Sequence, residues 1–404
     1  MMKKRKVRKI FFLFLVIAIT SVVLIVETYA WFVGTSTVST DVFTINVTGA
    51  QGLELSLDGT TWYSDSNKLT ISQAAITTDL SSTYSTNTNK WPTGGLYPVS
   101  SSGHFDLSVS RLIFYEKASL AATEGGFRLI ANRVDNYTSN NDVLVSEAEG
   151  YVAFDLFIRN GMGDAYNGSN QELVYLMKDP VATIDGTTDY GAANSLRIGF
   201  FELGAVKAKN VNIYTLYAIK CNYTSGGVTN KCYAGGQSRG AVWNIWEPNN
   251  ASHTSSAVSY FNQACKKRDS SGNYLSTACT SLTTTLSKVT YAIRSDISSS
   301  DNVDIYDGQY LNSYAGTTYS STNTDGKLTS MATYKSPTSS TTYDTNNQLL
   351  TLAGNSITKV RVYIWLEGQD IDNYDVITGN SNVKISFGLT KDRYEIGGSP
   401  SPSS

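Results

Sequence analysis

The stretch KVRVYIWLEG, residues 359–368, carries the plainest β-strand pattern in the chain. Successive side chains of a strand point to opposite faces of its sheet, so apolar and polar residues can sort to different sides. One face carries Val360, Val362, Ile364 and Leu366, and the other carries Arg361, Tyr363, Trp365 and Glu367. Alternation with a period of two is typical of a strand with one buried face.

The same alternation recurs along the chain and predicts many short strands. The expected strands cover residues 42–47, 53–57, 105–109, 112–115, 126–132, 151–158, 173–177, 196–203, 211–219, 289–293, 360–366 and 383–389. Asp58-Gly59 signals a turn, and short helices are expected only at 73–79 and 258–266. The pattern predicts a mostly β protein, an antiparallel β-sandwich or jelly roll with long loop insertions.

The length of 404 residues is enough for one large core or two medium ones. Alternation at both ends of the chain predicts one domain over 31–396. Within it we expect a cysteine-bearing insertion at 205–288 and a Ser- and Thr-rich loop at 296–350, and the sequence leaves open whether these form a second domain. Residues 397–404 read as a flexible tail.

Residues 1–30 predict an N-terminal hydrophobic export helix. Six cations within the first nine residues precede an apolar run at 10–26, so the basic end stays in the cytoplasm and the rest is translocated. Thr28 and Ala30 are small enough for a signal peptidase site, which predicts cleavage between Ala30 and Trp31. The alternative is an uncleaved membrane anchor, because the run nearly reaches the roughly 18 residues needed to span a bilayer. Either way, the body is expected outside the cell or on its surface.

Charge argues against a nucleic-acid partner. Charged residues make up 16% of the chain and its formal net charge is -2, which becomes -7 once residues 1–30, with six cations and one acid, are removed. A mildly acidic body without a basic stripe cannot neutralise a phosphate backbone.

Four cysteines follow the export segment, an even number that is typical of disulfides in an oxidising compartment. Their spacing predicts two local bridges, Cys221 to Cys232 and Cys265 to Cys279. A zinc site is the alternative, but the chain has no CxxC and only two histidines, His104 and His253.

No enzyme motif is found in the sequence. The chain lacks HExxH, GxSxG with a nearby histidine, a Walker A loop and GxGxxG. A glycosidase needs two carboxylates, but spacing selects no pair. The sequence therefore favours a non-catalytic protein that needs no cofactor.

Two acidic clusters are candidates for calcium, which prefers several oxygen ligands from one loop. The candidate ligands are Asp301, Asp304, Asp307, Glu367, Asp370 and Asp372. The alternative is that these are ordinary solvated turns. Trp243 and Trp246 could stack on a sugar ring or dock a neighbouring subunit, or could simply pack locally.

The N-terminal region resembles the TasA and camelysin family of secreted fibre proteins. The likeness rests on residues 28–32 (TYAWF), 37–39 (TVS) and 43–45 (FTI), although Val33-Gly34 stands where the family more often has Thr-Asp. The resemblance implies a SipW-type signal peptide and a jelly-roll subunit that polymerises by donating its N-terminal strand.

The physical case for such assembly is a free, apolar, strand-forming arm at 31–47 after cleavage. Its candidate assembly residues are Trp31, Phe32, Val42, Phe43, Ile45 and Val47. The alternative is that the arm pairs within its own sheet. We expect a cell-surface or biofilm-matrix fibre subunit that binds itself or other surface proteins, or else a membrane-anchored adhesin or glycan-binding module.

Overall fold

The protein is mostly β, with antiparallel sheets, as the sequence predicts. The computed structural model describes residues 44–49, 52–64, 68–106, 110–117, 130–133, 147, 150–161, 171–176, 181–185, 192–221, 223–225, 228–234, 237–239, 242–246, 254–257, 259, 349–368, 370, 372–373 and 382–392. The predicted export segment, both ends of the chain and residues 260–348 lie outside this description, and with them the predicted strand at 289–293 and almost all of the predicted loop at 296–350.

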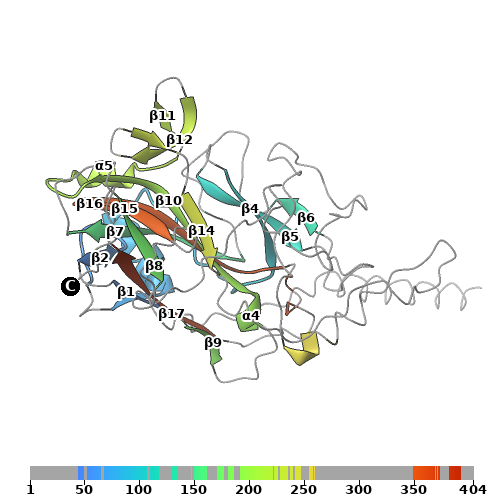
Figure 1. Ribbon diagram of the computed structural model, residues 1–404. Helices are drawn as coiled ribbons and strands as arrows, with labels where there is room; N and C mark the ends of the chain where they lie inside the picture. The colour runs from blue at the N-terminus through green and yellow to red at the C-terminus, as the bar shows by residue number, and fades with distance from the viewer. Residues whose placement is uncertain are drawn as a thin grey trace, which may run out of the picture.

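An eight-stranded sheet forms the centre of the molecule (Figure 1). Its main order is β11-β12-β10-β16-β7-β2, with β13 paired to β12 and β14 to β10. The bounds are β2 Leu53–Ser56, β7 Val152–Asn160, β10 Leu196–Lys207, β11 Tyr223–Ser225, β12 Val228–Ala234, β13 Gln237–Arg239, β14 Val242–Trp246 and β16 Ser356–Leu366. The strand β16 lies between β10 and β7 and pairs with both in antiparallel register.

A six-stranded sheet packs against one face of the first, in the order β15-β8-β17-β1-β3 with β9 also paired to β17. The bounds are β1 Thr44–Gly49, β3 Leu69–Ile71, β8 Gln171–Leu176, β9 Val181–Asp185, β15 Leu350–Ala353 and β17 Asn382–Asp392. The strand β1 runs parallel to β17, whereas the other pairs of this sheet are antiparallel. A strand from each end of the chain therefore meets in one sheet, as expected.

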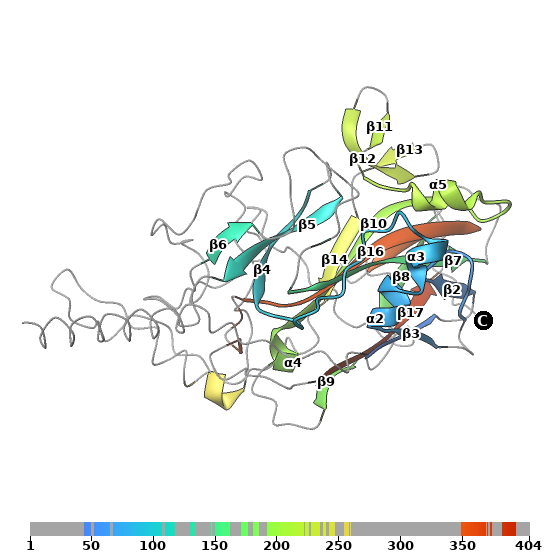
Figure 2. The ribbon, with the colours of Figure 1, turned by 180° about the vertical axis from the view of Figure 1, so that it is seen from behind.

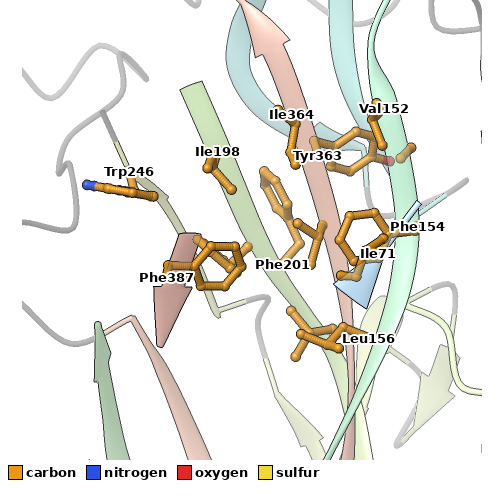
Figure 3. Packing of buried hydrophobic residues seen from close by; sticks show 14 of the residues in the cluster. Ile71, Val152, Phe154, Leu156, Ile198, Phe201, Trp246, Tyr363, Ile364 and Phe387 are labelled. Atoms are coloured by element: carbon orange, nitrogen blue, oxygen red, sulfur yellow. The ribbon is translucent and has the colours of Figure 1, made fainter. Parts of the chain in front are cut away.

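Aromatic and branched side chains fill the space between these two sheets (Figure 3). Phe387 of β17 packs edge-on against Phe200 of β10, with ring centroids 5.4 Å apart, and against Trp246 of β14 at 6.2 Å. Burial of an aromatic or aliphatic side chain contributes roughly 1.5–3 kcal/mol, so each of these side chains stabilises the packing of the two sheets.

A third layer covers the opposite face of the eight-stranded sheet. It contains a three-stranded sheet in the order β4-β5-β6 and short helices (Figure 2). The bounds are β4 Val99–Asp106, β5 Arg111–Lys117, β6 Ile130–Arg133, α2 Gln73–Thr77, α3 Leu80–Thr83 and α5 Ile213–Tyr217. Phe114 of β5 meets Trp365 of β16 edge-on at 5.3 Å. A further helix, α4 Ala192–Ser195, directly precedes β10.

Because of this third layer, β16 is buried on both faces along its whole length. The predicted alternation is present, but the expectation of one buried face is wrong for this strand. Lys359 and Arg361 are only 5% and 2% exposed.

The segment 211–219, predicted as a strand, contains helix α5 instead. The Asn212 side chain accepts a hydrogen bond from the Tyr214 backbone N–H at 2.9 Å and caps the helix. The predicted turn at Asp58-Gly59 is confirmed and faces α5: Gly59 has φ +69°, and a Cβ atom there would lie 2.6 Å from Leu216 Cδ2. Short helix α2 confirms the helix expected at 73–79.

Part of the expected insertion at 205–288 belongs to the main body. The strand β14 pairs with β10 over five residues, and β12 pairs with the end of β10. Ile245 and Trp246 are buried in the core. The sequence pattern did not reveal these short strands because few of their residues alternate.

Candidate functional site

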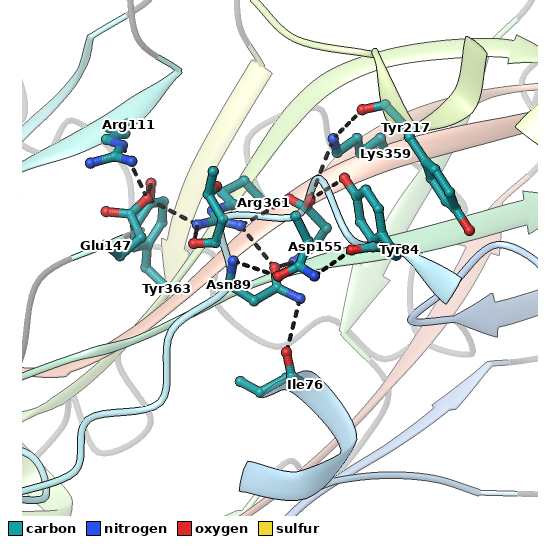
Figure 4. Close-up of polar contacts among 12 residues, drawn as sticks. Ile76, Tyr84, Asn89, Arg111, Glu147, Asp155, Tyr217, Lys359, Arg361 and Tyr363 are labelled. Carbon is teal, nitrogen blue, oxygen red and sulfur yellow. Dashed lines mark hydrogen bonds and ion pairs between the residues drawn. The ribbon is translucent and has the colours of Figure 1, made fainter. Parts of the chain in front are cut away.

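Buried charges gather where the third layer covers β16 and β7 (Figure 4). Asp155 of β7 is at their centre. Its carboxylate contacts Arg361 Nη1 at 3.1 Å and Lys359 Nζ at 3.3 Å, and accepts a hydrogen bond from the Tyr84 hydroxyl at 2.7 Å. The register of β16 and β7 places Arg361 directly opposite Asp155, with Lys359 two residues away on the same face.

Glu147 is the second carboxylate of this cluster. It accepts hydrogen bonds from Arg361 Nη2 at 3.0 Å, Tyr363 at 2.9 Å and Tyr151 at 2.8 Å. The Nε atom of Arg111 lies 3.7 Å from the same carboxylate. Arg361 therefore bridges the two acids.

Asn89 connects the cluster to the helical part of the third layer. Its side-chain oxygen accepts hydrogen bonds from Arg361 Nη1 at 3.0 Å and from the Asp155 backbone N–H at 2.9 Å. Its amide nitrogen donates to the Ile76 carbonyl of α2 at 3.5 Å. These bonds fix the cover over the charged face of the sheet.

Five buried charged side chains make up the described part of this cluster. Arg111, Lys359 and Arg361 carry three positive charges, and Glu147 and Asp155 carry two negative ones. Each of the five residues is at most 5% exposed. A buried ion is costly unless it is paired, so these side chains depend on their partners within the protein.

Burial and charge shift the ionisation of these groups. Burial lowers the pKa of Lys359, and the attraction of Asp155 offsets this only in part. Burial alone would raise the pKa of Asp155, but Lys359 and Arg361 outweigh it and the pKa is lowered. Burial, together with the charge of Asp155, raises the pKa of Tyr84 well above its usual value, so this phenol stays a neutral donor.

A cavity of about 490 Å³ opens next to the cluster. Asp155, Lys359 and Arg361 line it on the sheet side, and Tyr84 and Tyr217 line it between α3 and α5. These two rings stack with centroids 4.0 Å apart. The rest of the wall is rich in hydroxyl groups, from Ser82, Thr83, Ser85, Thr86, Thr88 and Ser110.

Hydrogen bonds hold the α5 side of the cavity in place. The Tyr217 hydroxyl donates to the Asp58 carbonyl at 2.7 Å and to the Thr83 carbonyl at 3.0 Å. Lys359 Nζ donates to the Tyr217 carbonyl at 3.0 Å. Tyr214, which also lines the cavity, is 77% exposed.

The predicted calcium ligands that the structure describes are bound to partners within the chain. Glu367 accepts hydrogen bonds from Trp365 Nε1 at 3.0 Å and from the Ser101 backbone N–H at 3.2 Å. Asp370 forms a buried ion pair with Arg197, and Asp372 accepts two hydrogen bonds from Thr254. Within the described part of the chain, no three His, Cys, Asp or Glu side chains form a metal-binding group.

Asp301, Asp304 and Asp307, the other calcium candidates, lie outside the described residues. Their proposed role stays a prediction.

Trp246 is a core residue, which corrects its assignment as a ligand-stacking candidate. Its side chain is 3% exposed and packs on Phe387. Local packing, the alternative weighed for this tryptophan, is what the structure shows. The side chain of Trp243 lies outside the description, although its backbone pairs with Phe201 in the sheet.

The predicted assembly strand is described from Thr44 onward, as β1. Ile45 and Val47 lie in the chain's own sheet, in register with the buried Ile385 and Phe387 of β17. Trp31, Phe32, Val42 and Phe43 lie outside the described residues, as does the predicted cleavage point between Ala30 and Trp31.

The predicted bridge from Cys221 to Cys232 is compatible with the backbone. The β11–β12 hairpin pairs Tyr223 with Lys231, which brings both cysteines to the same end of the hairpin. Cys221 is buried, the side chain of Cys232 is outside the description, and so are Cys265 and Cys279. Both pairings stay predictions.

Sequence reasoning missed the charged cluster. The signal was present in two strands, where Asp155 and Arg361 each interrupt a run of apolar residues. Two opposite charges in strands that read as core could have suggested a buried pair. Tyr84, Asn89 and Glu147 lie in segments without strand alternation and gave no such signal.

The chain matches no known protein family, no curated protein and no solved structure. In the part of the chain that the structure describes, no helix is both long and apolar enough to cross a membrane.

Proposed function

We propose that this chain is a non-catalytic extracellular structural protein, a cell-surface or biofilm-matrix fibre subunit that assembles by exchanging its N-terminal strand. In this proposal the export segment is cleaved after Ala30, the body is a jelly-roll subunit, and disulfides join Cys221 to Cys232 and Cys265 to Cys279. The resemblance of residues 28–45 to the TasA and camelysin family supports the same function.

The observation that carries the proposal is the position of β1. This strand lies between β17 and β3, and its parallel pairing with β17 extends over six residues. Ile45 and Val47 occupy the register positions of Ile385 and Phe387, which are 1% and 3% exposed. Without β1, the edge of β17 would lose its hydrogen-bond partner and part of the core would lose its cover.

The connection to the rest of the chain allows exchange. Only residues 50–52 separate β1 from β2, which belongs to the other sheet. If this link straightens, the same β1 can pair with β17 of a second copy and satisfy the same hydrogen bonds. A three-residue link reaches at most about 10 Å, so consecutive subunits would touch directly.

Cross-linking between β1 and β17 tests this proposal. Asn46 is in register with Ser386, whose side chain is exposed. We would mix the single variants Asn46→Cys and Ser386→Cys, allow assembly, and treat the sample with a short bismaleimide. A cross-linked dimer on a denaturing gel is expected, because a strand from one copy lies on the sheet of another.

A matched pair on the same strand provides the control. Thr183 of β9 is in register with Lys384 of β17, and both side chains are exposed. The mixed single variants Thr183→Cys and Lys384→Cys should give no dimer, since both strands stay in one body. Absence of the Asn46–Ser386 dimer, together with an intramolecular cross-link in the double variant, would show that β1 stays in its own sheet and would refute the proposal.

A further inference from the structure

Three polar side chains meet at the interface between the eight-stranded and the six-stranded sheet. Asn160 is the last residue of β7, Glu172 lies on β8 and Lys391 lies on β17. Lys391 is in register with Val174, two residues from Glu172, so the two charged side chains are on the same face of their sheet. Asn160 belongs to the other sheet (Figure 1). This triad therefore connects the two sheets.

The Lys391 ammonium contacts both other members of the triad. Its Nζ atom lies 2.6 Å from Asn160 Oδ1 and 2.6 Å from Glu172 Oε2. The side-chain carbonyl carbon of Asn160, Cγ, is one C=O bond of about 1.2 Å from Oδ1. The distance from Nζ to Cγ is therefore at most about 3.8 Å, close to the roughly 3–3.5 Å at which two groups are placed to react.

Glu172 contacts two nitrogen atoms with one oxygen. Its Oε2 atom accepts a hydrogen bond from Asn160 Nδ2 at 2.6 Å, in addition to its contact with Lys391 Nζ. Asn160 Nδ2 also donates to the Ala353 carbonyl at 3.2 Å. An ammonium can only donate, whereas a carboxylate and a carbonyl can only accept, so these contacts fix the orientation of the Asn160 amide. A carboxylate in this position can move a proton from the lysine nitrogen to the amide nitrogen.

The triad is shielded from water. Asn160 and Glu172 are buried, and the Lys391 side chain is 11% exposed. Two opposite charges are costly to hold in such a place. Transfer of a proton from Lys391 to Glu172 removes both charges and leaves a neutral amine, which is the nucleophilic form of lysine. An ordinary ion pair is the alternative, but it needs no amide bonded to both of its members.

We propose that Lys391 and Asn160 join in an intramolecular isopeptide bond, with Glu172 as the catalytic residue. Lys391 Nζ attacks Asn160 Cγ, a C–N bond forms, and the bond from Cγ to Nδ2 breaks. Glu172 passes one proton from Nζ to Nδ2, which leaves as ammonia, and takes up the second proton that Nζ loses. An ammonium, a carboxylate and a primary amide thus give a secondary amide, a carboxylic acid and ammonia. Nothing is oxidised or reduced, so no other reactant is needed.

The bond links β17 to β7 and so joins the two sheets covalently. It closes residues 160–391 into a loop, which restricts the unfolded chain. In the proposed fibre, β17 is the strand that accepts β1 of the next copy, so a pulling force on β17 reaches the eight-stranded sheet through a covalent bond. The bond forms within one chain and does not depend on assembly.

Intact mass of the full chain, measured after denaturation and reduction, tests the bond. The protein should be lighter than its sequence by one ammonia, about 17 Da. Trypsin cannot cleave after an acylated Lys391, so digestion should give a branched peptide that joins residues 160–178 to residues 385–393. An unreduced mass, with separate peptides 160–178 and 385–391, would overturn the proposal.

The branched peptide is required because Asn160-Gly161 offers a second way to lose ammonia. In an Asn-Gly sequence, the glycine backbone nitrogen can attack the asparagine side chain and close a succinimide ring. In this fold the Gly161 N–H donates to the Gly52 carbonyl at 3.1 Å, which holds the nitrogen in place. Loss of ammonia without the branched peptide would indicate a succinimide and would also refute the bond.

Variants of the full chain assign the roles. Lys391→Arg keeps the positive charge but removes the amine, and it should give the full mass. Glu172→Gln should give at least about tenfold less branched peptide, because a positioned acid–base group contributes roughly 10²–10⁴-fold to a rate. The matched controls are Lys384→Arg on β17 and Glu54→Gln beside β7, which should form the bond normally. A normal yield in Glu172→Gln would refute the role of this carboxylate.

Discussion

The two faces of β16 differ in what holds them. On one face Val360, Val362 and Ile364 pack against the six-stranded sheet, and they stabilise the fold by burying apolar surface. On the other face Lys359 and Arg361 are equally buried but are held by specific partners. Removing apolar atoms from a hydrophobic core lowers the free energy of unfolding in proportion to the number of atoms removed. Removing one member of a buried ion network lowers it strongly, because the partner is left as an unpaired buried charge.

The largest effect is expected on the charged face. Asp155→Asn removes one of two carboxylates, so Lys359 loses its carboxylate partner and Arg361 keeps only Glu147. We therefore expect a loss of about 3–5 kcal/mol in the free energy of unfolding. Urea denaturation of the purified variant measures this. A loss below about 1 kcal/mol would mean that the network contributes little.

A somewhat smaller, graded loss is expected on the apolar face. Ile364→Ala should cost about 3 kcal/mol, because it leaves a cavity between the sheets, and Ile364→Val should cost about 1 kcal/mol. The same urea measurement applies. If the two variants lose equal stability, buried apolar surface does not determine the stability contributed by this face of β16. The contrast with the charged face at Asp155 would then be wrong.

Tyr84→Phe removes a hydrogen bond to a charged group of the cluster while the packing of the aromatic ring is kept. It removes the hydrogen bond to Asp155 and should cost about 2 kcal/mol, typical of a bond to a charged group. The pKa of Asp155 lies below 3.8 in the folded state, so its stabilisation is present above pH 3.8 and is lost as the pH falls through the folded value. Without the Tyr84 bond this pKa rises, and the acid loss should begin at higher pH.

Tyr217→Phe is the control for that shift, because its hydroxyl donates to backbone carbonyls and not to Asp155. Urea midpoints measured between pH 2 and 6 should show that the loss of stability in acid begins at higher pH in Tyr84→Phe but not in Tyr217→Phe. Equal displacement in both variants would exclude Asp155 as the group responsible.

The smallest effect is expected for an exposed ion pair. Glu54 and Arg159 pair on neighbouring strands with about a third of each side chain exposed. Glu54→Gln should cost about 0.2–1 kcal/mol, because solvent screens the pair and Arg159 keeps its position over the Trp62 ring. A loss as large as that of Asp155→Asn would show that burial does not set the difference between the two pairs.

The strand content could be predicted because it depends on local alternation, as in residues 360–366 and 383–389. The burial of both faces of β16 could not, since it depends on a cover supplied by Tyr84 and Asn89, about 270 residues away in sequence. The helix α5 was missed because its apolar residues, Ile213, Leu216 and Tyr217, outweighed the capping signal of Asn212. The parallel pairing of β1 with β17 could not be predicted either, because it joins two segments from opposite ends of the sequence.

The central claim is that the chain is exported, cleaved and assembled through its N-terminal strand. N-terminal sequencing and intact mass of the protein recovered from cells and medium, followed by electron microscopy of the same sample, test it most directly. The account predicts a mature start at Trp31 and filaments. An intact Met1 in the membrane fraction without filaments would contradict it and leave an anchored surface protein.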